Sequence, residues 1–310
     1  MPTSTGGAHQ RILLLGKDGQ VGWELQRTLA LLGTVIALNR GQLDLADFNE
    51  IRAIVREVNP TIIVNAAAYT AVDKAEEERE LAMAVNGVAP GILAEEAKHL
   101  GAAIVHYSTD YVFDGTKTAP YTEKDQSSPI NIYGSTKLRG EQAIQAADVP
   151  HLILRTSWIY GMRGRNFLLT ILRLVREREE LKVVDDQIGA PTWSRLVAEA
   201  TAQILAQGKG SLVGYLEQAG GLYHLAASGE TTWYGFAKAI VELDPGQTEQ
   251  TPKALKPVPA SEYLTAARRP AYSVLGSDKL SRTFALDLPD WRTQLKLVLD
   301  GSDEGTSRCT

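Results

Sequence analysis

The fold is decided near the N-terminus, by the stretch Arg11-Ile12-Leu13-Leu14-Leu15-Gly16-Lys17-Asp18-Gly19-Gln20-Val21-Gly22. A short apolar run that ends at a glycine predicts a buried strand, and helical spacing follows over 23–32. A glycine-rich turn between them lets the backbone approach a pyrophosphate, while the helix N-terminus supplies N–H groups. The spacing is Gly-x-x-Gly-x-x-Gly, not the commoner Gly-x-Gly-x-x-Gly, so a plain tight turn is the alternative. Its position favours a dinucleotide site that includes Gly16, Gly19, Gln20, Val21 and Gly22.

Strands and helices then alternate along the chain. Strands are expected at 35–39, 61–65, 103–108 and 151–156, and helices at 45–58, at 80–100 and from Tyr133. This alternation predicts an α/β fold with a doubly wound parallel sheet, a Rossmann domain for NAD(P) over 11–160.

The pattern loosens after residue 160. Helices are expected at 166–178, 194–207 and 232–243, extended segments at 181–184 and 222–226, and loops at 251–259 and 268–270. We expect a smaller, partly interleaved substrate-binding lobe over 161–300, which returns some elements to the sheet. The ends, 1–10 and 301–310, are expected to be disordered.

The composition is that of a globular protein with a substantial core. The 310 residues are 44% hydrophobic and 22% charged, with a formal net charge of -5, which argues against a general nucleic-acid binder. The apolar runs are too short to span a membrane, and residues 1–10 do not have the order of a signal peptide. A cytoplasmic enzyme without a nucleic-acid or membrane partner is the expectation.

Two further segments bear on the cofactor. An acid that binds the ribose 2′-hydroxyl is expected at the end of the second strand, but Asn39 and Arg40 stand there. An amide does not repel a 2′-phosphate and Arg40 could pair with one, which favours NADPH, with NADH as the alternative. Asp44 and Leu45 could flank the adenine, although Asp44 could equally be an ordinary helix N-cap.

The segment 65–70, Asn-Ala-Ala-Ala-Tyr-Thr, ends a central strand with three small residues. Small side chains there would let a flat cofactor pass over the backbone, and the alternative is an Ala-rich helix start. The cofactor candidates in this segment are Ala67, Ala68, Tyr69 and Thr70.

The proton-transfer candidates lie further along. Tyr133 and Lys137 are four residues apart, so on a helix they share one face, and the ammonium should lower the pKa of the phenol. Ser108 and Thr109 end a strand 24 positions earlier, where a hydroxyl could hydrogen-bond a substrate carbonyl. Taken singly, these residues could be a surface tyrosine, a solvated lysine and a strand cap.

Together, these motifs resemble the extended short-chain dehydrogenases/reductases, and within them the dTDP-4-dehydrorhamnose reductases. The resemblance covers about 11–298. It is carried by the segments 16–25, 64–76, 108–115, 133–141, 155–158, 186–192, 221–225 and 267–270.

The resemblance implies reduction of dTDP-4-dehydro-β-L-rhamnose to dTDP-L-rhamnose by NAD(P)H, the last step of dTDP-rhamnose biosynthesis. Tyr133 would donate the proton, Lys137 would be its electrostatic partner and contact the nicotinamide ribose, and Thr109 would assist at the carbonyl. Gly19, Gln20 and Val21 would contact the pyrophosphate, and Ala68, Tyr69 and Thr70 the rest of the cofactor.

The dTDP-sugar would contact Asp110 and Trp158, with core packing as the alternative for Trp158. Asn166 could touch the nucleotide. Arg269, next to Arg268, could bind the diphosphate, with a surface salt bridge as the alternative.

Some relatives form homodimers through a shared Mg²⁺ held by glutamates. Glu24 is kept here, but Arg195 occupies the place of another such acid, so a Mg²⁺ requirement stays open and no metal ligand is assigned. The five histidines, at 9, 99, 106, 151 and 224, show no metal-ligand spacing and are expected to be structural or exposed. Two rival functions remain: another sugar-nucleotide reductase, epimerase or dehydratase, and a regulatory subunit like that of methionine adenosyltransferase.

Overall fold

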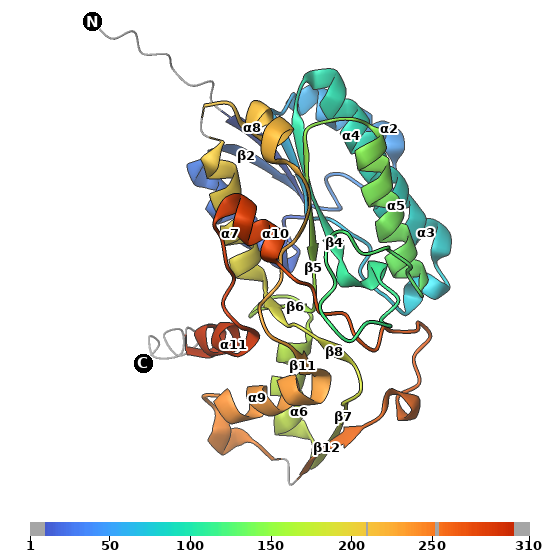
Figure 1. Ribbon diagram of the computed structural model, residues 1–310, viewed down its shortest axis with the longest axis vertical. Coiled ribbons are helices and arrows are strands. Elements are labelled where there is room, and N and C mark those ends of the chain that lie inside the picture. Colours follow the sequence, from blue (N-terminus) through green and yellow to red (C-terminus); the bar gives the residue numbers. More distant parts are fainter. Residues whose placement is uncertain (1–9, 209, 252–253, 301–310) are drawn as a thin grey trace, which may run out of the picture.

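A six-stranded parallel sheet organises the protein, in the strand order β10-β5-β4-β3-β1-β2 (Figure 1). The computed structural model describes residues 10–208, 210–251 and 254–300. The strands are β1 (Gln10–Leu15), β2 (Gly33–Leu38), β3 (Ile62–Asn65), β4 (Ala103–Thr109), β5 (His151–Thr156) and β10 (Gly221–His224).

Helices cover both faces of this sheet, which confirms the doubly wound α/β fold. In β1, Ile12 and Leu14 join the hydrophobic cluster on one face, while Leu13 and Leu15 join the cluster on the other. This alternation is the two-residue period of a strand buried on both faces. The first face packs against α1 (Gln20–Thr28), α7 (Ser194–Gln207), α8 (Leu212–Ala219) and α10 (Asp278–Phe284); the second packs against α2 (Phe48–Val58), α4 (Ala89–Leu100) and α5 (Ile132–Ala146).

The chain reverses its direction of travel across the sheet at β1. Strand β2 lies on one side of β1, while β3, β4, β5 and β10 follow on the other. In open parallel sheets a ligand binds at such a switch point, beyond the carboxyl ends of the strands. The glycine-rich turn leaves β1 at this end.

A second group of elements has a hydrophobic cluster of its own, and Figure 1 shows α6, α9, β7 and β12 beyond one end of the sheet. The chain returns from this group to the sheet, where β10 pairs with β5. The elements not yet named are α3 (Arg79–Met83), β6 (Ile159–Tyr160), α6 (Phe167–Glu177), β7 (Glu180–Val184), β8 (Ile188–Gly189), β9 (Thr192–Trp193), β11 (Thr231–Thr232), α9 (Trp233–Leu243), β12 (Ala254–Val258) and α11 (Trp291–Asp300).

Three expectations differ from the structure. The segment 251–259 was predicted to be a loop, but Ala254–Val258 forms β12, which pairs with β7 in parallel. Pro257 is compatible with this because β12 is an edge strand. The helix predicted at 80–100 is interrupted by a π-helical segment, Ala84–Val88. Of the ends expected to be disordered, Gln10 begins β1, and 1–9 and 301–310 lie outside the described residues.

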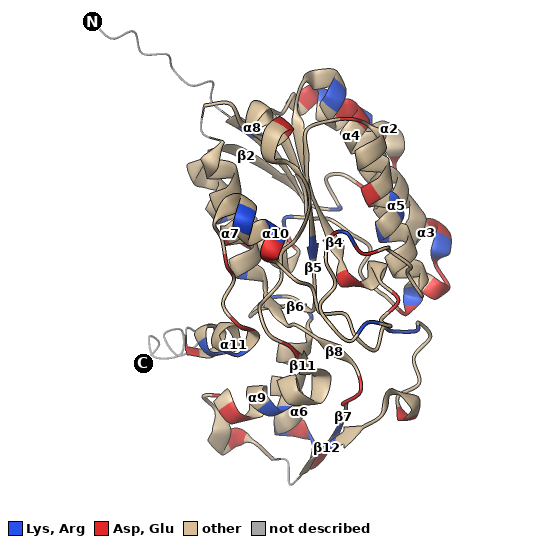
Figure 2. Cartoon of the chain, in the orientation of Figure 1, with Lys and Arg blue, Asp and Glu red and all other residues tan. Residues whose placement is uncertain are grey.

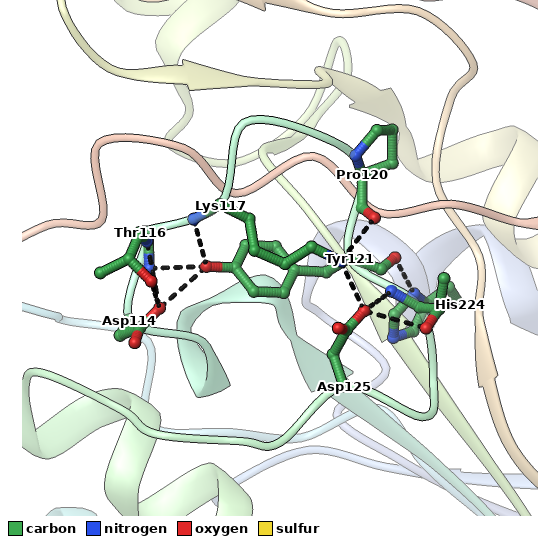
Figure 3. A network of polar contacts seen from close by, with 9 residues as sticks. Asp114, Thr116, Lys117, Pro120, Tyr121, Asp125 and His224 are labelled. Carbon is green, nitrogen blue, oxygen red and sulfur yellow. Dashed lines mark hydrogen bonds and ion pairs between the residues drawn. The ribbon is translucent and has the colours of Figure 1, made fainter.

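A polar network anchors the loop between β4 and α5 (Figure 3). The Tyr121 hydroxyl donates to Asp114 Oδ1 at 2.9 Å, and the Tyr121 carbonyl oxygen lies 3.1 Å from Nδ1 of His224, the last residue of β10. Lys117 Nζ donates to Asp125 Oδ2 at 2.8 Å. The loop is therefore tied to the end of β10.

The surface carries both signs of charge. Figure 2 shows that acidic and basic residues are interspersed along the helices. Across the described residues, none of the helices combines the length and apolarity needed to cross a membrane.

Candidate active site

A cavity of about 830 Å³ lies at the switch point, beyond the ends of β1, β2, β3 and β4. This volume is within the range of small-molecule and cofactor sites. Gly22, Asn166 and Arg269 are the predicted site residues that do not line it. The predicted residues that line it are Gly16, Gly19, Gln20, Val21, Asn39, Arg40, Asp44, Leu45, Ala67, Ala68, Tyr69, Thr70, Thr109, Asp110, Tyr133, Lys137 and Trp158.

The glycine-rich turn is built so tightly that two of its glycines cannot carry a side chain. Gly16 has φ +83°, and a Cβ there would lie 2.7 Å from Ala67 N, while a Cβ on Gly22 would lie 2.1 Å from Gly16 O. Gly19 is the N-cap of α1, and no side chain caps the helix. The first N–H groups of α1 are therefore free to bind an anion beside the cavity, which fits the pyrophosphate of a dinucleotide.

The end of β2 presents an amide and an exposed cation. Asn39 Nδ2 donates to Asp18 Oδ2 at 2.8 Å. Arg40 is 72% exposed, and its guanidinium lies 3.4 Å from Asp44 Oδ2, so a stronger anion could displace that contact. The alternative of Asp44 as a helix N-cap is wrong, because Asp47 caps α2 by accepting from two backbone N–H groups.

The segment after β3 is irregular, so the alternative of an Ala-rich helix start there is wrong. Asn86 holds this segment in place: its Oδ1 accepts from Tyr69 N at 2.9 Å, and its Nδ2 donates to Tyr69 O at 3.0 Å. Asn86 lies in the π-helical segment and is buried. Its position inside an expected helix gave no sign of this role.

Tyr133 lies in the first turn of α5, which begins at Ile132. Asn131 caps this helix by accepting from Gly134 N at 2.8 Å, and a Cβ on Gly134 would lie 2.0 Å from Tyr111 O. Thr109 lies close enough to the Tyr133 hydroxyl to affect its pKa. The expectation of a lowered phenol pKa is wrong: burial raises the pKa of Tyr133 to about 12, although the Thr109 hydrogen bond opposes the rise.

The Lys137 amine is held by the backbone of β4. Its Nζ donates to Tyr107 O at 2.5 Å and lies 3.3 Å from His106 Nε2. Burial lowers the pKa of Lys137 to about 8, although the charge of Glu141 opposes the change.

Thr109 links Tyr133 to an acid. Its Oγ1 donates to Asp110 Oδ1 at 3.0 Å and accepts from Tyr111 N at 3.1 Å. Because the single hydroxyl proton of Thr109 goes to Asp110, Thr109 Oγ1 can donate to a second oxygen only when that proton turns away from Asp110. Burial raises the pKa of Asp110 to about 7.

Trp158, two residues after the end of β5, also lines the cavity. Its backbone has φ 46°, uncommon for a bulky residue, and its ring stacks on Trp233 with centroids 3.5 Å apart. Gly189 is needed beside it, since a Cβ there would lie 2.4 Å from the indole. The stacking on Trp233 gives one flat aromatic wall.

The two remaining substrate candidates make internal contacts. Asn166 caps α6 by accepting from Leu169 N at 3.1 Å, and its Nδ2 donates to Gln20 Oε1 at 2.9 Å. Arg269 forms a two-pronged ion pair with Asp73, with N–O distances of 3.1 Å and 2.7 Å, which is the salt-bridge alternative. Among the cavity residues that the sequence did not single out, Asp18 and Arg165 are the charged ones.

The two positions considered for a shared Mg²⁺ make ion pairs within the chain. Glu24 pairs with Arg27 at 2.6 Å, and Arg195 pairs with Glu199 at 2.9 Å. Within the described part of the chain, no group of three or more His, Cys, Asp or Glu side chains could hold a metal ion. No step of the chemistry is therefore assigned to Mg²⁺.

Comparison with known proteins gives a consistent result. The family model of the RmlD substrate binding domain matches residues 10–303. A dTDP-4-dehydrorhamnose reductase of Burkholderia thailandensis is 48% identical over 93% of this chain and 98% of its own length. The enzyme of that name from Escherichia coli K12 is 47% identical over 93% of this chain and 97% of its own length.

Solved structures agree. The crystal structure of a dTDP-4-dehydrorhamnose reductase from Clostridium acetobutylicum matches with a TM-score of 0.86 and 36% identity, covering 94% of this chain and 99% of that one. The Bacillus anthracis enzyme in complex with NADP matches with a TM-score of 0.84 and 34% identity over the same shares. A Thermus thermophilus UDP-glucose 4-epimerase, 19% identical over 94% of this chain and 98% of that one with a TM-score of 0.75, shares the fold alone. The chain therefore belongs to the RmlD substrate binding domain family, together with the dTDP-4-dehydrorhamnose reductases that its motifs resemble.

Proposed function

We propose that this protein reduces dTDP-4-dehydro-β-L-rhamnose to dTDP-L-rhamnose with NAD(P)H. One observation carries the proposal: a half-buried tyrosine, Tyr133, and the side chain of Thr109 line the same cavity as an uncapped helix N-terminus behind a glycine turn. Membership of the reductase family supports the substrate. When bound, the nicotinamide supplies the hydride that reduces the C4 ketone.

Tyr133 would hand a proton to the ketone oxygen as negative charge grows there. With its pKa raised to about 12, the phenol carries its proton throughout the physiological range. A ketone oxygen between the two hydroxyls would accept from Tyr133, and from Thr109 once the Thr109 proton turns away from Asp110. A positioned acid of this kind contributes about 10²–10⁴-fold to the rate.

Thr109 and Lys137 would prepare this transfer. Thr109 is held by Asp110 and by Tyr111 N, so its hydroxyl has a fixed position from which to orient the carbonyl. Lys137 lies one helical turn from Tyr133, and its charge would stabilise the phenolate that remains after the proton has left.

Two segments that line the cavity would hold the two halves of the cofactor. Gly16, Gly19, Gln20 and Val21 would hold the pyrophosphate, and Ala67–Thr70 would pass beneath the nicotinamide half. We propose NADPH as the preferred cofactor, because Asn39 does not repel a 2′-phosphate and the exposed Arg40 can pair with one. NADH is the second candidate.

Asp110 and Trp158 are the proposed contacts of the sugar nucleotide. The flat wall of Trp158, supported by Trp233, suits a sugar ring or a base. Asp110, with a pKa near 7, can either donate or accept a hydrogen bond to a sugar hydroxyl.

A single assay tests the function. Purified protein is mixed with dTDP-4-dehydro-β-L-rhamnose and either NADPH or NADH, cofactor oxidation is followed by absorbance, and the product is identified by NMR. We expect dTDP-L-rhamnose, formed more efficiently with NADPH. A product that keeps its ketone would indicate an epimerase, and absence of oxidation with tight binding to another enzyme would indicate a regulatory subunit.

A further inference from the structure

Behind Lys137, a line of buried polar groups runs from the amine back to the segment that lines the cavity after β3. Ala67 N donates to Asn65 Oδ1 at 3.2 Å, Asn65 Nδ2 lies 3.2 Å from His106 Nδ1, and His106 Nε2 lies 3.3 Å from Lys137 Nζ. Asn65 and His106 are each 1% exposed, and Lys137 is 2% exposed, so water cannot replace a missing partner in this line.

The direction of each contact follows from the chemistry of the groups. A backbone N–H can only donate, so Asn65 must turn its oxygen to Ala67 and its NH₂ to His106. Nδ1 of His106 therefore accepts. Burial and the neighbouring lysine hold the pKa of His106 well below its usual value, so the ring is neutral and its single proton lies on Nε2.

A donor therefore points at the lysine. An Nε2–H group facing Lys137 Nζ forms a hydrogen bond only if the nitrogen has a lone pair, as a free amine does; an ammonium would set two donors against each other. The amine keeps two protons, of which one serves the carbonyl oxygen of Tyr107. When Lys137 is charged, the ammonium and the Nε2–H group of His106 face each other as two donors, and one proton has no acceptor.

The other titratable groups around Lys137 do not remove this conflict. Glu141 is the nearest acid on α5, but Arg155 of β5 holds both of its oxygens, at 2.9 Å and 2.6 Å. The phenol of Tyr107 is bonded to Thr201 on the other face of the sheet, and the neutral phenol of Tyr133 faces Thr109. The direction of the lowered lysine pKa agrees with this arrangement.

We propose that His106 is a positioning residue which, oriented by Asn65 with its proton on Nε2, favours the uncharged amine of Lys137 until a ligand fills the cavity. This inference rests on the proposed function for its catalytic meaning. The charge of Lys137 then depends on the oxygen atoms that a bound cofactor or a Tyr133 phenolate presents to it. Ala67, which lines the cavity, fixes the orientation of Asn65 by donating its backbone N–H to Asn65 Oδ1. The same line of hydrogen bonds is therefore held at both of its ends.

The proton position can be read directly by long-range ¹H–¹⁵N NMR of histidine rings in the ligand-free full chain, with His106 assigned from its absence in a His106→Gln variant. We expect a protonated Nε2 and a bare Nδ1 from pH 6 to 9. His224 is the internal control, because its Nδ1 faces the carbonyl oxygen of Tyr121 and must carry the proton (Figure 3). A His106 ring protonated at Nδ1, or a doubly protonated ring, would overturn the inference.

The variant Asn65→Asp tests the coupling to Lys137. The carboxylate of this variant can accept hydrogen bonds both from Ala67 N and from a protonated Nδ1 of His106. The ring proton is then expected on Nδ1 instead of Nε2, so that an unprotonated Nε2 faces the lysine. We expect the Lys137 titration, followed by ¹³Cε NMR, and the alkaline limb of kcat to move up by about 1–3 pH units. If the His106 ring proton lies on Nδ1 in this variant and the Lys137 titration stays where it is in the wild type, the coupling is refuted. The NMR results use ligand-free protein, so they stand or fall separately from the reductase assay, and the wild-type ring remains a test if the variant fails to fold.

Discussion

Replacing Lys137 by methionine should abolish most activity and yet leave the fold as stable as the wild type or more so. The pKa of this lysine falls from 10.5 to about 8 in the folded protein. Each pKa unit corresponds to about 1.36 kcal/mol, so burying the charged group costs about 3 kcal/mol at pH 7. Methionine fills a similar volume without a charge, but it leaves the Tyr107 carbonyl oxygen without its donor, which costs about 1–3 kcal/mol. The expected net gain is about 0–2 kcal/mol.

The pH dependence distinguishes this account from a simple packing effect. Between pH 8 and 10.5 the unfolded chain binds a proton at Lys137 that the folded chain does not, so this group adds to wild-type stability as pH rises. The advantage of Lys137→Met over the wild type should therefore shrink by about 1.3 kcal/mol between pH 7 and pH 9, a value that does not depend on the lost Tyr107 hydrogen bond.

Urea unfolding at the two pH values, monitored by tryptophan fluorescence, measures both quantities. Lys98→Met is the matched control: Lys98 also donates to a backbone carbonyl oxygen, but its side chain is 54% exposed, so the substitution removes a similar contact without removing a buried charge. A loss of more than about 3 kcal/mol at pH 7 in Lys137→Met, or a difference that stays constant with pH, would refute the reasoning.

Three further variants test other parts of the site. Arg40→Ala should raise the KM for NADPH roughly tenfold, the loss of one charge-assisted contact, and leave the KM for NADH unchanged; equal effects on both cofactors would argue against a 2′-phosphate contact. Asn86→Ala should destabilise the protein by about 1–3 kcal/mol and weaken cofactor binding, because Tyr69 N and O lose their partners; calorimetry of unfolding and of cofactor binding would measure both. Gly189→Ala should raise the KM for the sugar nucleotide and spare the cofactor Kd, since the new methyl group meets the indole of Trp158; an unchanged substrate KM would remove Trp158 from the binding wall.

Local patterns predicted much of the fold. Strand β5 and helix α7 have the bounds expected from the sequence, because each combines a clear apolar period with flanking polar residues. The prediction failed where tertiary contacts override local preference. Pro257 suggested a loop, but an edge strand tolerates a missing N–H, and pairing with β7 makes Ala254–Val258 extended.

The same distinction applies to the candidate site: motif residues were predictable from the sequence, whereas properties set by tertiary contacts were not. Gly16 and Tyr133 belong to motifs with fixed spacing, so the sequence placed them in one candidate site, and both line the cavity. The pKa of Tyr133 could not be foreseen from its distance to Lys137 along a helix, because burial, Thr109 and the nearby Asp110 carboxyl act on it through tertiary structure. The role proposed for His106 depends on the orientation of one amide group, which spacing does not reveal.

The central claim is that the phenol of Tyr133 protonates the ketone, and the variant Tyr133→Phe tests it most directly. Thr109 keeps its bonds to Asp110 and to the backbone in this variant, so the fold and the cofactor Kd should be retained. Tyr111→Phe is the control, a neighbouring ring at 5.9 Å that does not line the cavity. With dTDP-4-dehydro-β-L-rhamnose and NADPH, kcat should fall about 10²–10⁴-fold in Tyr133→Phe, while Tyr111→Phe keeps most of its turnover. A kcat near that of the wild type in Tyr133→Phe would contradict the mechanism.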